Sequence, residues 1–411
     1  MKSVKIVLLA TIISACSSST MSSSKMAADP ALDKLKQRAN ETNSDAVLIF
    51  KDGKEILNYS SGRHDEPIET MSATKSIVSL AIGFLIDDGF LESVDTPVWK
   101  FYPEWKQGRK ELITVRHLLN HTSGLQSNPT TQEIYYNPGQ DFVKLALAAE
   151  LTDDPGTKFF YNNKATNLLA GIVQTASHLP MDEYLDQRLF IPLGITRSEW
   201  HWDHDGAGNP HGMAGLQMTA QGLAKIGQLV LHKGTWNGQR LISENWIDIS
   251  LAAGSSLEEG CGLLWWRRSN FDENKFFYDK NLLNTYRKAG ISENYIVRLE
   301  AILGELLPQT EIRTKLEDVL GGAAAFADFY QQVKAKSVPE INIKIGPIRF
   351  FSAEGSLGQY LVIFPEKGMV GVRQIHEQSS REAEQAQQAH EENSWDRDPM
   401  FEDFGQLLLQ L

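Results

Sequence analysis

Ser72 and Lys75 are the residues whose types and spacing first indicate chemistry. They lie three positions apart in the segment Thr70-Met71-Ser72-Ala73-Thr74-Lys75, and residues three apart share one face of a helix. A serine hydroxyl becomes a nucleophile when a base takes its proton, and a lysine that burial keeps neutral can be that base. An unpaired N–H group of a first helical turn can stabilise an oxyanion. The segment therefore predicts a nucleophile, its base and half of an oxyanion hole.

The residues after this segment predict the helix that positions it. Apolar side chains at positions 77, 78, 80, 81, 84 and 85 fit one helical face. We expect Thr70 to be the N-cap and the helix to end near 87–89. A second match to the S-x-x-K pattern, Ser22 to Lys25, lies in a predicted linker, so the pattern alone proves little.

Tyr161 and Asn163 are candidates for a second catalytic element. A tyrosine beside a lysine ammonium can have its phenol pKa lowered and move protons, and an asparagine amide can orient a substrate or the lysine. The segment Tyr135-x-Asn137 offers the same pattern. We favour Tyr161 because a Pro-Gly turn precedes it and a buried helix follows, which makes a rigid mount.

His117 and His121 are four residues apart and could bind a metal from one helical face. Position 118 is leucine, however, where a metalloprotease motif has its general-base glutamate, and the sequence offers no evident third ligand. We therefore interpret both histidines as structural and expect neither a metal nor another cofactor.

Composition and length indicate a globular protein with a large core. The chain has 411 residues, of which 42% are hydrophobic and 22% charged. Its formal charge of −12 and the absence of a basic stripe argue against a nucleic-acid partner. We expect residues 30–411 to form one elaborate domain, with 268–345 as a helical insertion.

The first residues predict export. A basic start is followed by an apolar stretch, Ile6 to Ala15, which is too short to span a bilayer. Residues Ile13-Ser14-Ala15-Cys16 resemble a bacterial lipobox with Cys16 as the lipidated residue; the alternative is an ordinary signal peptide with an incidental cysteine. We expect 1–16 to be the signal, 17–29 a flexible tether, and the protein to be lipid-anchored in the bacterial envelope, on the periplasmic side of the outer membrane.

The sequence predicts strands near both ends of the domain. A short helix is expected at 31–39, and a hairpin with Asp52-Gly53 at its turn is expected over 46–59. Its first strand is continuously apolar, which predicts cover on both faces. Further strands are expected at 348–353, 360–364 and 369–373.

Five segments together resemble the serine β-lactamase and penicillin-binding-protein superfamily. They are SATK at 72–75, HLLNHTSGL at 117–125, PGTKFFYNN at 155–163, a stretch from Gly215 to Ser243, and GLLWW at 262–266. The likeness covers about 31–267 and 346–411. It is greatest to the class C-like branch, which includes family VIII esterases and 6-aminohexanoate-dimer hydrolases.

The resemblance implies a fold and a set of roles. The fold would be α+β, an antiparallel sheet from both chain ends flanked by helices. Ser72 would be acylated, Lys75 would be its base and Tyr161 the proton shuttle, with Asn163 in support. The family's third motif, on an edge strand, falls on Ala353-Glu354-Gly355-Ser356, so the N–H of Ser356 would complete the oxyanion hole.

One departure bears on the substrate. Where the superfamily has lysine or histidine in this motif, the chain has Ala353, with Glu354 beside it. A substrate carboxylate would meet a like charge there, unless Arg349 or a residue of the insertion supplies a cation. We also expect the insertion to form a lid or wall over the pocket.

The sequence thus favours a serine hydrolase that cleaves a small ester or amide through an acyl-enzyme. Two alternatives stay open: a D,D-peptidase or β-lactamase, and a non-catalytic binding lipoprotein on a hydrolase fold. The expected partner is a small molecule, with membrane contact by the lipid anchor only.

Overall fold

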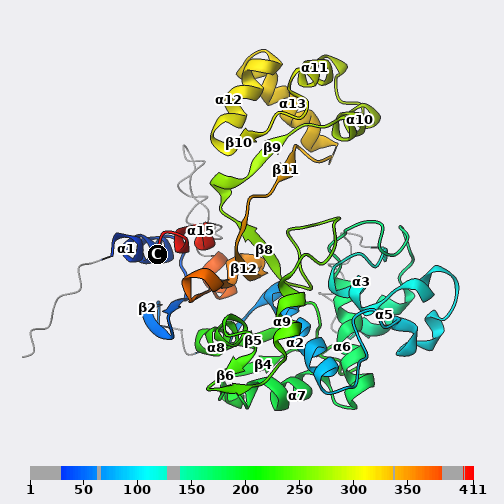
Figure 1. Cartoon of the computed structure of the whole chain (residues 1–411), viewed down its shortest axis with the longest axis vertical. Helices are drawn as coiled ribbons and strands as arrows, with labels where there is room; N and C mark the ends of the chain where they lie inside the picture. The colour runs from blue at the N-terminus through cyan, green and yellow to red at the C-terminus, as the bar shows by residue number, and fades with distance from the viewer. Residues whose placement is uncertain (1–28, 63–65, 127–138, 337, 382–400, 402) are drawn as a thin grey trace, which may run out of the picture.

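A six-stranded antiparallel sheet lies at the centre of the fold (Figure 1). The computed structural model describes residues 29–411 apart from 63–65, 127–138, 337, 382–400 and 402. In sheet order the strands are β2 (Lys54–Ser60), β1 (Ala46–Lys51), β14 (Met369–Gln374), β13 (Gln359–Phe364), β12 (Ile348–Gly355) and β8 (Trp266–Ser269). The predicted α+β class is confirmed, because both ends of the chain supply this sheet and helices flank it.

Strand β1 is covered on both faces, as its continuous apolar run predicts. Ala46 and Leu48 belong to one hydrophobic core, whereas Val47 and Ile49 belong to a second core on the opposite face. Alternate side chains of a strand point to opposite faces, so each core takes every second residue. The β1–β2 hairpin turns at Asp52-Gly53, where both residues have positive φ, as a tight hairpin turn requires.

The larger core lies between the sheet and a helical layer. Its helices include α2 (Thr74–Asp87), α6 (Asn163–Ser177) and α8 (Ala220–Leu231). Shorter elements extend this layer: α3 (Val115–Leu119), α5 (Phe142–Ala148), α7 (Met181–Leu185), α9 (Glu244–Leu251), and the small sheets β3-β5-β4 (Ile68–Glu69, Leu216–Met218, Trp200–Trp202) and β6-β7 (Thr235–Trp236, Gln239–Arg240). Helix α2 is buried along nearly its whole length, which makes it a rigid mount for the residues at its start.

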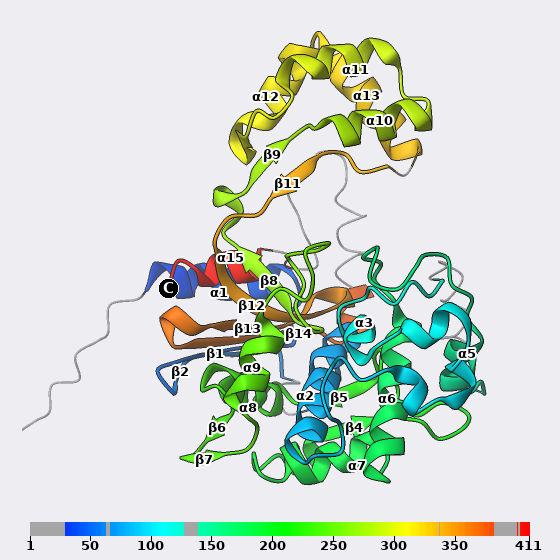
Figure 2. The same cartoon turned by 45° about the vertical axis from the view of Figure 1, so that its right-hand side comes forward.

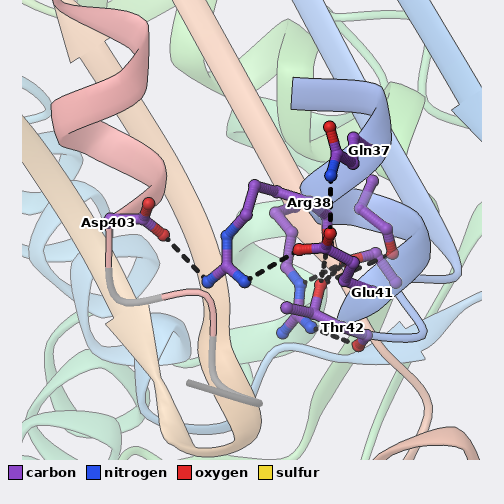
Figure 3. Close-up of polar contacts among 8 residues, drawn as sticks. Gln37, Arg38, Glu41, Thr42 and Asp403 are labelled. Atoms are coloured by element: carbon purple, nitrogen blue, oxygen red, sulfur yellow. Dashed lines mark hydrogen bonds and ion pairs between the residues drawn. The ribbon is translucent and has the colours of Figure 1, made fainter. Parts of the chain in front are cut away.

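The opposite face of the sheet is covered by the two terminal helices, α1 (Pro30–Glu41) and α15 (Phe404–Leu408). Arg38 links them, because its guanidinium lies 3.2 Å from a carboxylate oxygen of Asp403 and 3.3 Å from one of Glu41 (Figure 3). The helix predicted at 31–39 is confirmed. Since α15 packs on this face, residues near the C-terminus can reach the end of the sheet formed by β12 and β8.

Residues 275–344 have a small hydrophobic core of their own, set apart from the main sheet in both views (Figures 1 and 2). They comprise the sheet β10-β9-β11 (Leu307–Pro308, Lys275–Phe277, Asn342–Lys344) and the helices α10 (Lys280–Ala289), α11 (Glu293–Leu299), α12 (Gln309–Leu320) and α13 (Ala323–Ala335). The chain leaves the main sheet after β8 and returns to it as β12. The strands that flank this segment are therefore neighbours in the main sheet.

The predicted signal peptide, the lipidation of Cys16 and the tether up to residue 28 lie outside the described residues. Across the part of the chain that is described, none of the helices combines the length and apolar character needed to cross a bilayer.

Candidate active site

Ser72 lies in a 3₁₀ turn, Met71–Ala73, that leads directly into α2. Thr70 occupies the N-cap position of this turn, but its side chain makes no capping hydrogen bond, because its hydroxyl donates to the carbonyl oxygen of Leu216 at 2.9 Å instead. Met71 has a φ of 51°, a left-handed conformation that is costly for a residue with a side chain. A strained residue thus directly precedes Ser72, and tertiary contacts hold the turn in place.

Lys75 brings a buried amine to the Ser72 hydroxyl. Its Nζ lies 3.0 Å from the Oγ of Ser72 and 2.6 Å from the carbonyl oxygen of Met213. Burial lowers the pKa of Lys75 to about 7, because water no longer solvates the ammonium. A sizeable fraction of the amine is therefore neutral at neutral pH and can accept the hydroxyl proton.

We expect the rate at which a fluorophosphonate labels Ser72 to rise with pH through a midpoint near 7, the pKa to which burial brings Lys75. Protonated Lys75 cannot take the serine proton, so the rate should fall about tenfold per pH unit below the pKa. Labelling rates between about pH 5 and pH 9, followed by mass spectrometry, measure this. A profile that stays flat across neutral pH would contradict a titrating base.

Tyr161 completes a cluster with Ser72 and Lys75. Its ring centre lies 4.9 Å from the Nζ of Lys75, and its side chain hydrogen-bonds that of Ser72. The predicted lowering of its pKa is wrong: burial raises the pKa of Tyr161 to about 12, outweighing the lowering effect of the hydrogen bond with Ser72. The phenol is therefore protonated at neutral pH and acts as a donor. The rival Tyr135-x-Asn137 and Ser22–Lys25 patterns lie outside the described residues.

His121 has a structural role, as interpreted from the sequence, and this role is exercised at the site itself, because His121 lines the hollow that contains Ser72 and Lys75. Its ring centre lies 4.6 Å from that of Tyr161, and its Nδ1 accepts the N–H of Asn162 at 3.1 Å. Burial, and secondarily the charge of Lys75, lowers the pKa of His121 to about 3. The ring is thus neutral at neutral pH, and since Nδ1 accepts, its proton is on Nε2. It packs against the phenol without adding a charge.

His117 has a different task from His121. Its Nδ1 accepts the N–H of Thr114 at 3.2 Å and so caps α3. Within the described ranges of the chain, no group of three or more side chains is arranged to hold a metal ion.

Asn163 is the first residue of α6, but it is not among the described residues that line the cavity at Ser72. Its Oδ1 is buried without a hydrogen-bond partner in the described part of the chain. The neighbouring Asn162 supports the site instead, because it caps α6 and its Nδ2 donates to the carbonyl oxygen of Leu125 at 2.8 Å. These bonds hold the backbone that carries Tyr161.

Gly355, at the end of β12, packs against the turn that contains Ser72. A Cβ on Gly355 would lie 2.3 Å from the carbonyl oxygen of Thr70 and 3.1 Å from the nitrogen of Ser72, so only glycine permits this approach. Ser356 follows and lines the same cavity as Ser72. The prediction that this strand lies at the edge of the sheet is wrong, because β8 is the edge strand. However, β8 pairs with β12 only as far as Ser352. The end of β12 therefore extends past β8 toward the site.

A buried arginine holds the chain just after Ser356. Arg373, on β14, donates from Nη1 to the carbonyl oxygens of Leu357 and Gly358 at 2.6 and 2.8 Å. Its Nε donates to the Oγ of Ser44 at 2.9 Å. These charge-assisted hydrogen bonds fix the loop at Leu357 and Gly358. The sequence patterns around Ser72 do not reveal this role of Arg373.

A cavity of about 500 Å³ opens above Ser72. Its lining residues come from the turn before α2, the segment before α6, the sheet and its end, the start of the insertion and the C-terminal segment: Ser72, Tyr161, Trp266, Arg268, Phe271, Phe350, Ser352, Glu354, Gly355, Ser356, Tyr360, Val362, Gly405 and Gln406. The lining combines polar groups with aromatic rings, as is usual for a small-molecule site.

The insertion contributes to the cavity only through its first residues, Arg268 and Phe271, among the residues that the structure describes. The prediction of a lid or wall is therefore wrong for the helices of the insertion, which project away from the sheet (Figures 1 and 2), whereas Arg268 and Phe271 do form part of the wall. Arg349 does not supply a cation to the cavity either, because it pairs with Glu273 at 2.5 Å. Among the described residues that line the cavity, the cation is Arg268.

A protein-family model described as Beta-lactamase matches residues 32–393. The chain belongs to the β-lactamase family. This is a family of serine hydrolases, and the cluster of Ser72, Lys75 and Tyr161 lies within the matched residues.

This β-lactamase-family chain matches two curated relatives over only part of their length. The 6-aminohexanoate-dimer hydrolase of Paenarthrobacter ureafaciens is 29% identical over 247 residues, which are 54% of this chain and 61% of that protein. Protein flp of Staphylococcus aureus (strain N315) is 30% identical over 171 residues, 38% of this chain and 34% of that protein.

Solved structures support the fold. A penicillin-binding protein from Bacillus halodurans has a TM-score of 0.53 at 15% identity, with 86% of this chain and 99% of that chain covered. The octameric penicillin-binding protein homologue from Pyrococcus abyssi has a TM-score of 0.53 at 19% identity, with 84% and 72% covered. At these identities the likeness concerns the fold alone.

Proposed function

We propose that this protein hydrolyses a small ester or amide through an acyl-enzyme on Ser72. The observation that carries the proposal is the 3.0 Å contact between the Ser72 hydroxyl and a buried Lys75 amine whose pKa is lowered to about 7. A nucleophile within hydrogen-bond reach of a base that is partly neutral is the arrangement that covalent catalysis needs.

Proton transfer would follow from the order of the pKa values. Neutral Lys75 takes the proton of Ser72 as the Oγ bonds to the substrate carbonyl carbon. The phenol of Tyr161 then gives its proton to the departing alcohol or amine as the bond to that group breaks. Because the pKa of Tyr161 is raised to about 12 and that of Lys75 is lowered to about 7, the lysine ammonium readily returns a proton to the phenolate. In the second half of the reaction, water attacks the acyl carbonyl carbon and the bond to the Oγ of Ser72 breaks. The acid is released and Ser72 regains its proton.

The N–H groups of Ser72 and Ser356 would stabilise the oxyanion of each tetrahedral intermediate. The packing of Gly355 against the nitrogen of Ser72 brings the two segments close enough for a shared hole. In this role the backbone, rather than a side chain, supplies the donors.

A D,D-peptidase or β-lactamase is the less favoured enzyme. Penicillins and D-Ala-D-Ala peptides carry a carboxylate, and the cavity has Glu354 in its wall. Glu354 already occupies the guanidinium of Arg268, so a carboxylate ligand would find no free cation there and would face a like charge.

The test is labelling of the purified protein with a fluorophosphonate, followed by peptide mass spectrometry. We expect one adduct on Ser72 and none in Ser72→Ala. Ser79→Ala is the matched control: Ser79 is also buried in α2, and its hydroxyl has no hydrogen-bond partner within the described residues, so labelling should persist. Wild-type protein that takes up no label and cleaves no short p-nitrophenyl ester would leave the non-catalytic binding role instead.

A further inference from the structure

Arg268 and Glu354 form an ion pair in the wall of the Ser72 cavity. Arg268 donates from Nε and Nη2 to the two carboxylate oxygens of Glu354, at 2.7 and 2.6 Å. Their side chains are 33% and 25% exposed, so water can reach both. The residues lie on β8 and β12, which run side by side at the base of the helical insertion (Figures 1 and 2).

Neighbouring groups hold both partners in place. The guanidinium of Arg268 lies 4.8 Å from the ring centre of Trp266, a cation–π contact. The hydroxyl of Ser352 donates to Glu354 at 2.5 Å. A bidentate pair fixed by a ring and a hydroxyl has few other arrangements open to it.

The remaining described wall of the cavity carries no charge and is rich in aromatic rings, which are Tyr161, Trp266, Phe271, Phe350 and Tyr360. Arg268 and Glu354 are therefore the only charged residues among the described lining, and they neutralise each other. Gln406, another lining residue, accepts from the N–H of Phe271 at 3.1 Å and donates to the carbonyl oxygen of Ser269 at 3.1 Å.

We propose that the Arg268–Glu354 pair determines substrate charge and restricts the site to substrates whose acyl group is uncharged. This rests on the proposed hydrolysis at Ser72. An acyl group that ends in a carboxylate has to displace Glu354 from Arg268 and is then repelled by it. An acyl group that ends in an ammonium has to displace Arg268 from Glu354 and is then repelled by Arg268. Each ion loses water and gains no free partner.

The selecting charges lie close to the chemistry. Glu354 lines both the large cavity and the small hollow that contains Lys75 and Tyr161. Discrimination should therefore be felt by short acyl groups, whose ends stay near the reacting carbonyl.

The test compares three short esters of one chain length, whose acyl groups end in a methyl, a carboxylate or an ammonium. For wild type, kcat/KM should be highest for the methyl ester. In Glu354→Gln, which frees Arg268, the anionic-to-neutral ratio of kcat/KM should rise about tenfold or more. In Arg268→Gln, which frees Glu354, the cationic-to-neutral ratio should rise by a similar factor and the anionic one should fall.

Ratios separate charge selection from other effects. Any change in the pKa of Tyr161, or any loss of folded protein, lowers the rates of all three esters together, whereas the proposal requires opposite shifts in the two variants. Arg349→Gln is the matched control. Arg349 lies on β12, as Glu354 does, and pairs with Glu273 at the base of the insertion. It lies outside the described cavity lining. Its ratios should equal those of wild type.

Two results would overturn different claims. If the wild type hydrolyses the neutral ester at Ser72 but both single variants keep its charge ratios, the ion pair does not select substrates. If Ser72 takes no fluorophosphonate label and none of the esters is cleaved faster than by Ser72→Ala, the proposed hydrolysis itself fails.

Discussion

Lys75→Met abolishes nearly all ester hydrolysis: we expect kcat to fall by about 10³-fold or more, the range seen when a catalytic base beside a nucleophile is removed. Methionine keeps the length of the side chain but cannot accept the proton of Ser72. The folded state should not suffer, because burial disfavours the protonated amine, as the pKa of about 7 indicates. Steady-state rates and thermal melting measure the two effects.

Two further variants make the interpretation of Lys75 specific. Lys75→Arg keeps a positive charge but cannot be deprotonated, so it should be as inactive as Lys75→Met. Lys164→Met is the control, because Lys164 is another poorly exposed lysine that donates to a carbonyl oxygen, that of Gln126, at 3.2 Å. It should stay within a few-fold of wild type. Substantial activity in Lys75→Arg would rule out the base role.

Gly355→Ala should lower kcat by about 10²-fold or more, the loss expected when an oxyanion donor is displaced. The new Cβ would lie 2.3 Å from the carbonyl oxygen of Thr70 and 3.1 Å from the nitrogen of Ser72. Both contacts are with backbone, which cannot rotate away, so β12 and the turn of Ser72 must move apart. We expect a stability loss of about 1–3 kcal/mol as well.

Gly227→Ala separates the two effects of Gly355→Ala. Gly227 lies on α8, and its Cβ would lie 2.6 Å from Leu361 and 2.7 Å from Val370 in the core. We expect this variant to melt earlier but to keep kcat at temperatures where it is folded. If Gly355→Ala behaves in the same way, with only its melting temperature reduced, the shared oxyanion hole is wrong.

Local patterns predicted the elements whose cause is local. The Asp52-Gly53 hairpin follows from turn chemistry, because both residues have the positive φ that a tight hairpin turn requires. The cap by Thr70 failed because a long-range partner, the carbonyl oxygen of Leu216, competes for its hydroxyl. The prediction that β12 is an edge strand failed because strand order depends on which distant segment pairs beside it.

The sequence by itself determined that Ser72 and Lys75 meet, because residues three apart at the start of a helix lie on one face whatever the rest of the chain does. It also determined that the first strand has two buried faces. Only the tertiary structure decided the direction in which the pKa of Tyr161 shifts and which charged residues line the cavity. Burial reverses the expected pKa direction of Tyr161, and Arg268 meets Glu354 across 86 positions of sequence. Both depend on strands and helices that pack from opposite ends of the chain, and desolvation and ion pairing exist only once that packing has formed.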